Sequence, residues 1–284
     1  MVNKKEYQLG LYEKSMPSEL SWKQKLAYCK EFGFDWLEIS IDETDEKLAR
    51  LEWNIDEIQQ VKTAINETGV PILTICLSGH RKYPLGSLEE KIVHRSLEIM
   101  EKAIYLAGEL GVRIIQLAGY DVYYEEGNEK TREQFKVNLK RAVEMAAKCG
   151  ITMGFETMET SFMDTVEKSM NIVDYINSPY LHVYPDIGNL TNAAKIYGHD
   201  VSEDLKKGSG HLVAAHLKET IPGHYREIPF GQGHTDYVPL IRTLKDSGVR
   251  MFVGEFWYVG QENWKEDCEF AAKFLQEKLD DVFQ

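Results

Sequence analysis

The stretch Cys149-Gly150-Ile151-Thr152-Met153-Gly154-Phe155-Glu156 carries the features that decide the fold. Gly150 follows a long amphipathic segment, and a glycine at a helix end can take the left-handed conformation that turns the chain back. The apolar run Ile151–Phe155 comes next and is typical of a buried strand. Glu156 then places a carboxylate at the end of that run. The stretch predicts a helix, a tight turn, a buried strand and a functional strand end.

The same order of features recurs along the chain. Short glycine turns lead straight into apolar runs at Phe32-Gly33-Phe34, Thr68-Gly69-Val70, Leu110-Gly111-Val112 and Ser247-Gly248-Val249. Eight strands are predicted: Gln8–Tyr12, Trp36–Ser40, Ile72–Leu77, Val112–Leu117, Ile151–Phe155, Leu181–Tyr184, Leu212–Leu217 and Met251–Phe256. Between them, stretches such as Leu88–Leu110 and Arg132–Lys148 have apolar residues at helical spacing, as in helices that pack outside a sheet.

An eightfold alternation of strand and helix closes into a barrel or opens into a doubly wound sheet. No glycine-rich dinucleotide or phosphate fingerprint follows the first strand, and no linker or change of composition divides the chain. The length of 284 residues suits an α/β barrel built as one unit. We therefore predict a single (β/α)8-barrel domain over residues 1–284 and keep the open sheet as the alternative.

Composition narrows the class of partner. The net charge of −13 disfavours extended contact with nucleic acid or an anionic membrane and favours a small-molecule substrate. We find no signal-peptide pattern and no apolar run near the roughly 20 residues that span a bilayer, so a cytoplasmic protein is expected. The four cysteines form no CxxC pair and are interpreted as reduced core or helix residues: Cys29, Cys76, Cys149 and Cys268.

Four ionisable residues stand at or just after the ends of successive predicted strands: Glu156, Asp186, His216 and Glu255. In a barrel, these ends meet at the face where active sites form. A single strand-end charge more often caps the next helix or pairs with a lysine, but the whole set, clustered at one mouth, needs a cation. Three carboxylates and one imidazole suit Mn²⁺, Co²⁺, Zn²⁺ or Mg²⁺. We predict that these four residues bind one divalent metal ion.

Long loops are expected after the third, fourth, sixth and seventh strands, at 78–87, 118–128, 187–199 and 219–236. The basic trio His80, Arg81 and Lys82 is a candidate for holding a phosphate or a hydroxyl, or is a solvated loop. Lys218 follows the end of a strand and is expected to bind an anion or to pair with Glu156 or Glu255. Weaker candidates are the stretch Pro229–Gly233, the histidines His211 and His234, and a possible sugar-facing wall of Tyr120, Tyr123 and Tyr124.

The chain resembles the sugar-epimerase branch of the xylose isomerase-like barrels over nearly its whole length. Within that branch it is most similar to 3-epimerases of L-ketopentose 5-phosphates, which act in L-ascorbate breakdown. The resemblance rests on Leu9-Gly10-Leu11-Tyr12-Glu13-Lys14, Ile41-Asp42-Glu43-Thr44-Asp45-Glu46, HRKYPLGS (80–87), IQLAGYDVYY (115–124) and YPDIGNL (184–190).

This resemblance implies a metal site at Glu156, Asp186, His216 and Glu255, with the two glutamates also moving the proton. It implies an isomerase that inverts C3 of L-xylulose 5-phosphate or L-ribulose 5-phosphate through a cis-enediolate, and a homodimer. The chain departs from the epimerases of free ketoses at Asn189 and Pro222, where those enzymes have His and Arg, and Arg226 is a possible substitute. His80, Lys218 and Arg226 are therefore the expected substrate-binding residues.

Other reaction classes remain open at this stage. A free-ketose 3-epimerase, an aldose–ketose isomerase or a hexulose-6-phosphate isomerase would use the same metal and enediolate. A phosphodiesterase like endonuclease IV would need several metals and a basic DNA-facing surface, which the charge of −13 disfavours. A sugar-binding regulator that has lost catalysis is disfavoured by the complete ligand set.

Overall fold

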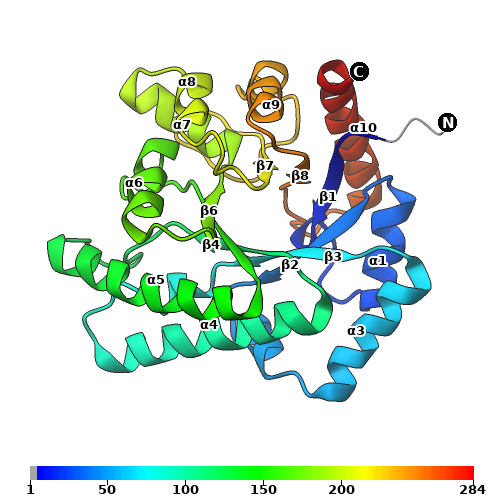
Figure 1. Cartoon of the computed structure of the whole chain (residues 1–284). Helices are drawn as coiled ribbons and strands as arrows, with labels where there is room; N and C mark the ends of the chain where they lie inside the picture. Colours follow the sequence, from blue (N-terminus) through cyan, green and yellow to red (C-terminus); the bar gives the residue numbers. More distant parts are fainter. Residues whose placement is uncertain (1–4) are drawn as a thin grey trace.

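The computed structural model describes residues 5–284, and its eight strands form one parallel sheet (Figure 1). The strands are β1 (Gln8–Tyr12), β2 (Trp36–Ile41), β3 (Ile72–Leu77), β4 (Ile114–Ala118), β5 (Thr152–Glu156), β6 (Leu181–Tyr184), β7 (Ala215–Leu217) and β8 (Met251–Gly254). Their side chains are almost all buried, as expected of a parallel sheet that is covered on both faces.

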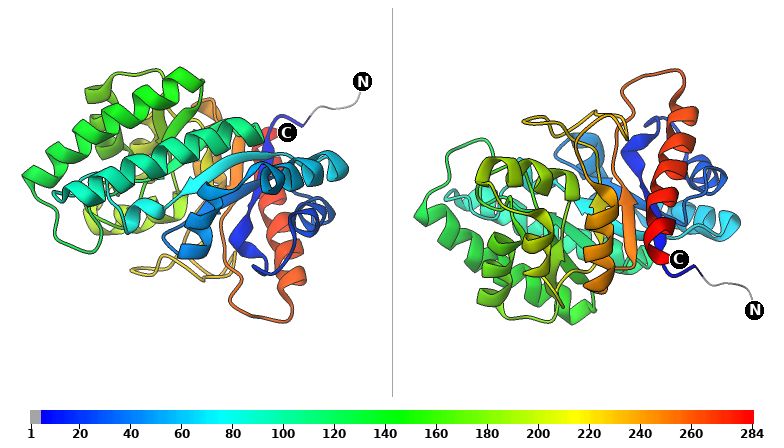
Figure 2. Two further views of the ribbon diagram at one scale, coloured as in Figure 1. Left: turned by 90° about the horizontal axis from the view of Figure 1, so that it is seen from below. Right: turned by 90° about the horizontal axis from the view of Figure 1, so that it is seen from above.

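Helices follow the strands and surround the sheet (Figures 1 and 2). The α-helices are α1 (Trp22–Glu31), α2 (Asp45–Leu48), α3 (Ile55–Thr68), α4 (Glu90–Leu110), α5 (Glu129–Cys149), α6 (Val166–Ile176), α7 (Ile187–Tyr197), α8 (Val201–Lys206), α9 (Tyr237–Asp246) and α10 (Trp264–Phe283). Short 3-10 helices are η1 (Glu13–Ser15), η2 (Ala49–Glu52) and η3 (Gly79–Arg81). In Figure 2, α10 (red) lies beside β1 (blue), and the rings of Tyr7 and Phe283 pack there in a tilted arrangement with their centroids 5.3 Å apart.

The sheet curls into a nearly closed barrel. The strand order is β6-β5-β4-β3-β2-β1-β8-β7, so each strand pairs with its neighbour in the sequence and β8 returns to β1. The seam between β6 and β7 is joined by isolated bridges, Val183 with Leu212 and Asp186 with His216. The predicted (β/α)8 barrel is confirmed, and the doubly wound alternative is wrong. Among the described residues, no helix is both long and apolar enough to cross a membrane.

The predicted strands all exist, with shifts of one to three residues at several ends. The glycine turns after α3, α4 and α5 also form as predicted, since Gly69, Gly111 and Gly150 are helix C-caps with φ between 68° and 73°. One prediction was wrong: the stretch 187–199 is not a long loop, because Ile187–Tyr197 is helix α7. Its Gly, Asn and Thr residues have low helix propensity, but Asp186 caps the helix and the helix packs against β7.

Candidate metal centre

Glu156, Asp186, His216 and Glu255, which we call the ligand group, meet at the C-terminal mouth of the barrel. Glu156 is the last residue of β5, Asp186 precedes α7, His216 lies in β7 and Glu255 follows β8. One ligand atom from each lies within 4.8 Å of all the others, and all four side chains are buried. The structure therefore brings together the four residues predicted from the strand ends.

The ligand group has unused bonding capacity at its centre. His216 Nδ1 lies 3.4 Å from Glu156 Oε1, 3.6 Å from Glu255 Oε2 and 3.9 Å from Asp186 Oδ2. Within residues 5–284, His216 Nδ1, Asp186 Oδ2 and Glu255 Oε2 are buried and make no well-aligned hydrogen bond, although Lys218 forms ion pairs with the two carboxylate oxygens. A buried polar atom without a partner is costly unless something binds it. Three such atoms, converging from three elements, fit a divalent cation with nitrogen and oxygen ligands.

Lys218 supplies a positive charge beside the ligand group. Its Nζ lies 2.7 Å from Asp186 Oδ2 and 3.0 Å from Glu255 Oε2, and the side chain is buried. Lys218 thus pairs with Glu255, as one of the sequence-based alternatives proposed, and with Asp186 in place of Glu156. One ammonium cannot neutralise three carboxylates, so the group still favours a cation.

The buried charges shift one another's protonation. Burial raises the pKa of Asp186 to about 7 against the lowering effect of Lys218, and the Glu255 and Glu156 carboxylates add to the rise. Burial would also raise the pKa of Glu255, but Lys218 and His216 hold it below its ordinary value. Burial opposes a charged His216, yet the carboxylates of Glu38 and Glu255 raise its pKa well above the ordinary value. The pKa values of the neighbouring carboxyl groups of Asp186 and Glu255 are thus shifted in opposite directions.

A second layer of hydrogen bonds orients the ligands. Gln116 Nε2 donates to Glu156 Oε2, and Asp186 Oδ1 accepts the backbone N–H of Asn189 at 2.8 Å. His216 Nε2 lies 2.7 Å from Glu38 Oε1. Sequence reasoning missed Gln116 and Glu38. The available signal was a polar residue in the middle of an apolar strand, where a parallel barrel leaves no solvent.

A cavity of about 470 Å³ opens above the ligand group. Glu156, Glu255 and Lys218 lie on its wall with Tyr12 and Trp257. Three basic side chains line it as well, and they come from three different loops: Lys14, Arg81 and Arg226. The cavity therefore combines a candidate metal centre with positive charge for an anionic substrate.

Two of the three expected substrate-binding residues lie on the wall of this cavity, and the third does not. Lys218 and Arg226 line the cavity, whereas His80 does not. The His80 ring is buried with Nε2 3.0 Å from the carbonyl oxygen of Ser96, and burial lowers its pKa to about 4. A neutral imidazole that is hydrogen-bonded to a helix backbone has a structural role. This placement therefore does not support substrate contact by His80. Its neighbour Arg81 lies on the cavity wall instead.

The tyrosines after β4 act behind the cavity. The hydroxyls of Tyr120 and Tyr123 donate to Glu159 at 2.9 and 3.2 Å, and Arg81 lies over both rings. Tyr124 is exposed and donates to Glu43. None of the three tyrosines is among the cavity-lining residues, so the predicted sugar-facing wall does not form. They hold Glu159 and Arg81, which do line the cavity.

The remaining weaker candidates also lie apart from the ligand group. The backbone of Gly231 donates to Glu219 Oε2 at 2.9 Å, so the Pro229–Gly233 stretch folds around a carboxylate of its own loop. The rings of His211 and His182 lie 5.4 Å apart, and His234 Nε2 lies 3.1 Å from Thr220 Oγ1. Neither His211 nor His234 lines the cavity above the ligand group.

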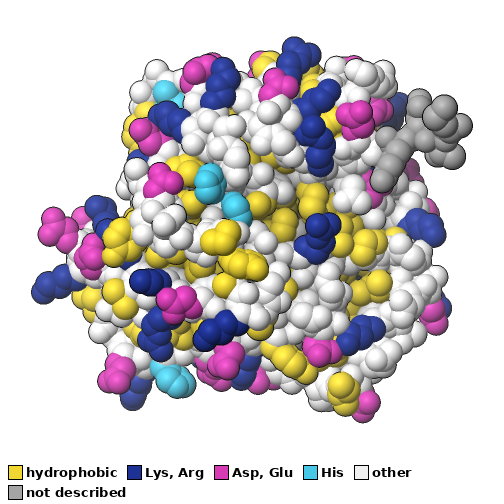
Figure 3. Space-filling view, viewed as in Figure 1, with side chains coloured by type: hydrophobic (Ala, Val, Ile, Leu, Met, Phe, Trp, Pro, Cys, Tyr) yellow, Lys and Arg dark blue, Asp and Glu magenta, His cyan; other side chains and the backbone are white. Residues whose placement is uncertain are grey.

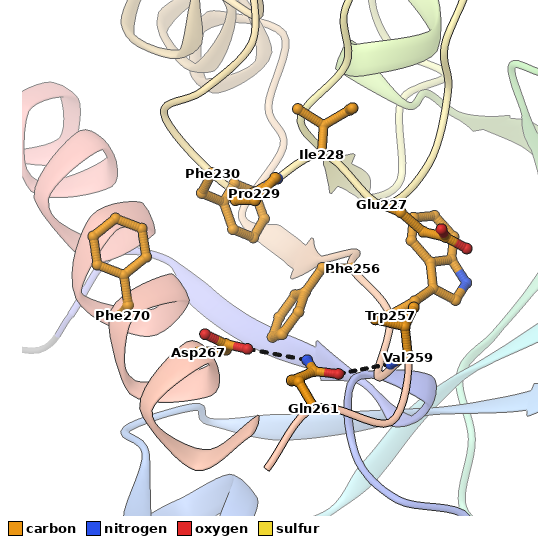
Figure 4. Close-up of a pocket in the computed structure, with 10 residues that line it drawn as sticks. All are labelled: Glu227, Ile228, Pro229, Phe230, Phe256, Trp257, Val259, Gln261, Asp267 and Phe270. Carbon is orange, nitrogen blue, oxygen red and sulfur yellow. Dashed lines mark hydrogen bonds between the residues drawn. The ribbon is translucent and has the colours of Figure 1, made fainter. Parts of the chain in front are cut away.

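A second cavity, of about 750 Å³, adjoins the first and shares Trp257 with it (Figure 4). Phe230, Phe256 and Phe270 give it an apolar lining, and Gln261 is hydrogen-bonded there to Asp267 at 3.0 Å. No basic side chain lines it among the described residues, unlike the cavity above the ligand group. The chemistry of the molecule is therefore concentrated in the cavity that contains the ligand group.

Fold and site together define a (β/α)8-barrel protein with a candidate divalent-metal centre at its C-terminal mouth. The profile of the family described as "Xylose isomerase-like TIM barrel" matches residues 26–277. The chain belongs to this family, as the sequence resemblance predicted.

The similar proteins fall into two groups. L-ribulose-5-phosphate 3-epimerase UlaE of Salmonella heidelberg (strain SL476) is 42% identical over 276 residues, which cover 97% of this chain and 96% of that protein. The protein of the same name from Escherichia coli O139:H28 is 43% identical over 94% of this chain and 91% of its own. The predicted resemblance to these epimerases is thus confirmed. Among solved structures, D-psicose 3-epimerase of Clostridium cellulolyticum H10 with D-tagatose has a TM-score of 0.80 at 16% identity, covering 96% of this chain and 99% of that one. This likeness shows the shared fold.

Proposed function

We propose that this protein is a metal-dependent L-ribulose-5-phosphate 3-epimerase, which interconverts L-ribulose 5-phosphate and L-xylulose 5-phosphate by inverting C3. The observation that carries the proposal is the buried ligand group, four residues with ligand atoms within 4.8 Å, in a chain 42% identical over nearly its whole length to a protein of that name. The metal is Mn²⁺, Co²⁺, Zn²⁺ or Mg²⁺, as three carboxylates and one imidazole favour.

Glu156, Asp186, His216 and Glu255 would hold the metal ion. When bound, a divalent cation supplies positive charge that makes the C3 proton acidic and stabilises the negative charge that develops at the ketose oxygens. The proposed chain of events then uses the protein's own carboxylates. One glutamate accepts the proton of C3, and the C3–H electron pair passes into the cis-enediolate. The other glutamate, already protonated, gives its proton to C3 from the opposite face, so the configuration inverts.

Glu156 and Glu255 are suited to work as such a pair. They come from strands β5 and β8, which are separated around the barrel by β6 and β7, so they approach the cavity from different sides. Lys218 and His216 hold the pKa of Glu255 below its ordinary value against the effect of burial, which keeps its carboxylate in the ionised form that a base requires. Which glutamate acts first depends on which epimer is bound.

We assign the substrate contacts to the cations on the cavity wall. Lys218, between Asp186 and Glu255, is in position to contact the oxygens nearest the reacting carbon. Arg226 is 45% exposed and only loosely paired, with Nη2 3.8 Å from Glu159 Oε1. Arg81 has a buried Nε without a hydrogen-bond partner among the residues that the structure describes. Both guanidinium groups can donate to a phosphate, the group for which arginine forks are well shaped. We further propose a cytoplasmic homodimer acting in L-ascorbate breakdown, as the sequence resemblance implies.

The test is incubation of metal-loaded protein with L-xylulose 5-phosphate in D₂O, followed by NMR. We expect deuterium at C3, formation of L-ribulose 5-phosphate, and loss of both after treatment with EDTA. Glu156→Gln and Glu255→Gln should each abolish inversion while leaving the far-ultraviolet circular dichroism unchanged. Full turnover by either variant would contradict the two-glutamate scheme. No exchange at any carbon would contradict the substrate assignment.

The rival functions predict other results. An aldose–ketose isomerase would form an aldose phosphate, which product analysis detects. A phosphodiesterase of the endonuclease IV type would cleave abasic DNA, and it would need a basic surface for the phosphate backbone. On the face in Figure 3, Lys and Arg side chains are interspersed with Asp and Glu. This pattern supports a small-molecule substrate.

A further inference from the structure

Glu38 is a charged residue at a position that ordinarily excludes charge. It lies in the middle of β2, whose six residues are all buried, and its own exposed fraction is 0%. Removing a carboxylate from water costs several kcal/mol unless its oxygens are hydrogen-bonded. Glu38 does not line the cavity above the ligand group, so no substrate contact accounts for it.

Both oxygens of Glu38 are fully engaged. Oε2 accepts hydrogen bonds from Thr74 Oγ1 at 2.6 Å and Tyr184 Oη at 3.1 Å. Oε1 lies 2.7 Å from His216 Nε2. Because two hydroxyls from β3 and β6 hold one oxygen, the other has a fixed direction, and that direction is toward the imidazole of the ligand group.

This arrangement determines which nitrogen of His216 is available. A carboxylate accepts a hydrogen bond but cannot donate one, so the proton of a neutral imidazole is held on Nε2 and the lone pair is on Nδ1. Nδ1 is the atom that faces Glu156 and Glu255 at 3.4 and 3.6 Å, and it has no hydrogen-bond partner in the described part of the chain. The ring of Tyr184 packs edge-on against the imidazole at 5.0 Å, which restricts its rotation.

We infer that Glu38 is a positioning residue, which acts through His216 to present Nδ1 to the metal ion. The inference deepens the proposed function and rests on its metal-dependent part. It assigns the Glu38–His216 pair, and the Thr74 and Tyr184 hydroxyls behind it, to metal affinity rather than to substrate contact. Carboxylates that orient a metal-binding histidine have a known cost of removal, about 10–100-fold in metal affinity or activity.

The test is the Glu38→Gln variant, which keeps the size of the side chain and removes its charge. Isothermal titration with Mn²⁺ and with Co²⁺, without substrate, should show a metal affinity about 10–100-fold weaker than in the parent protein. The visible absorption of the Co²⁺ form should also shift, because the histidine ligand is less firmly oriented. At saturating metal, KM for the sugar phosphate should stay close to the parent value, since Glu38 does not touch the substrate.

A matched control separates metal positioning from loss of a buried charge. Asp204 is also buried and accepts hydrogen bonds from the backbone of Val166 and Glu167 at 2.8 and 3.1 Å, but it is not part of the ligand group. Asp204→Asn should leave the metal affinity and the Co²⁺ spectrum unchanged. If Glu38→Gln does not fold, the double variant Thr74→Val, Tyr184→Phe tests the same idea, because it releases the carboxylate. That variant should also bind metal more weakly than the parent.

The outcomes distinguish this inference from the proposed reaction. Unchanged Co²⁺ affinity in a folded Glu38→Gln protein would overturn the role of Glu38. The absence of any divalent-cation binding by the parent protein would overturn that role together with the metal-dependent part of the proposed function. Intact metal affinity without inversion at C3 would overturn the proposed reaction alone.

Discussion

Two clusters of buried charge lie at this end of the barrel, and they differ in how their charges are met. The Glu13 cluster consists of Glu13, Lys25, Lys47 and Arg50, which join the segment after β1 to α1, α2 and η2. The other is the ligand group with Lys218. All of these side chains are buried. In the Glu13 cluster three cations surround one carboxylate, whereas in the ligand group one ammonium serves three carboxylates.

The hydrogen bonds follow the same contrast. Glu13 Oε1 accepts from Lys25 at 2.9 Å and from Arg50 at 2.7 Å, and Oε2 accepts from the backbone of Ser40 at 2.8 Å. The ring of Trp22 lies within 5.3 Å of Lys25 and 4.9 Å of Arg50, which helps to satisfy their positive charge. In the ligand group, by contrast, Asp186 Oδ2 and Glu255 Oε2 share the single ammonium of Lys218, and His216 Nδ1 has no hydrogen-bond partner among residues 5–284.

The difference teaches how to separate a structural charge cluster from a binding site. A buried group whose every acceptor is used stabilises the fold and has nothing left to bind with. A buried group whose acceptors outnumber the donors around them lowers the stability of the ligand-free protein, and a bound ligand restores that stability. The two clusters should therefore respond in opposite ways to substitution and to metal.

The largest effect is expected for Asp186→Asn. Asparagine caps a helix as well as aspartate does, so α7 should still begin at the same residue. The variant should lose at least about a thousandfold in turnover, because several kcal/mol of charge stabilisation at the metal centre is removed. Its metal-free form should be about as stable as the metal-free parent, because the relieved repulsion between like charges offsets the lost ion pair with Lys218, which keeps Glu255 as its partner. Steady-state kinetics and thermal unfolding of the metal-free proteins measure both. A clear fall in metal-free stability would contradict the distinction between the clusters.

Glu13→Gln should mainly affect stability. It leaves three buried cations with a neutral partner, and breaking a buried ion pair from one side typically costs about 3–5 kcal/mol of unfolding free energy. Denaturant unfolding measures the loss, and metal titration of the folded variant should give the parent affinity. A weaker metal affinity with unchanged stability would contradict the assignment of a structural role to the Glu13 cluster.

Metal binding should stabilise the protein in proportion to occupancy. At a free metal concentration of about 100 times Kd, the native state gains about 2.7 kcal/mol if the unfolded chain does not bind. Thermal unfolding with and without EDTA should show this gain in the parent and in Glu13→Gln, and it should be absent in Asp186→Asn. An equal gain in Asp186→Asn would mean that the cation binds elsewhere.

The smallest effect concerns acid. Burial would raise the pKa of Glu13, but Arg50, Lys25 and Lys47 outweigh burial and hold it well below its ordinary value of 4.5. A carboxyl group whose native pKa is lowered contributes stability above its unfolded pKa, and that contribution is lost as the pH falls below it. The stability difference between the parent and Glu13→Gln should therefore be constant near neutral pH and shrink below pH 4.5. Denaturant unfolding at a series of pH values measures it, and a difference independent of pH would contradict the assignment.

The sequence was enough to predict the features that recur in each strand–helix unit. The glycine turns and apolar runs predicted the strands and the barrel, and the strand-end positions of Glu156, Asp186, His216 and Glu255 predicted their convergence. Each of these features depends on a few neighbouring residues, because a parallel barrel brings all strand ends to one face.

What the sequence did not predict depends on distant partners. Glu38 needs Thr74, Tyr184 and His216, which lie 36, 146 and 178 residues away. His80 and Arg81 are adjacent, yet one is buried against Ser96 and the other lines the cavity, and η3 determines which side chain faces inward. Helix α7 was missed because Asp186 was interpreted as a ligand-group residue alone, whereas it is also the N-cap of that helix.

The position of the ligand group at the seam between β6 and β7 links metal binding to the closure of the barrel. The other neighbouring strands are joined by ladders, of which the β2–β3 ladder has a register shift between Leu37 and Glu38, but here the backbone contributes isolated bridges, one of which links Asp186 to His216. A cation bound by both of these side chains would join β6 to β7 at the place where the barrel has the fewest backbone hydrogen bonds. Local opening of the barrel, measured as amide hydrogen exchange along β7, should then become slower when the protein binds metal. The metal centre would in that case stabilise the closed barrel in addition to its part in catalysis.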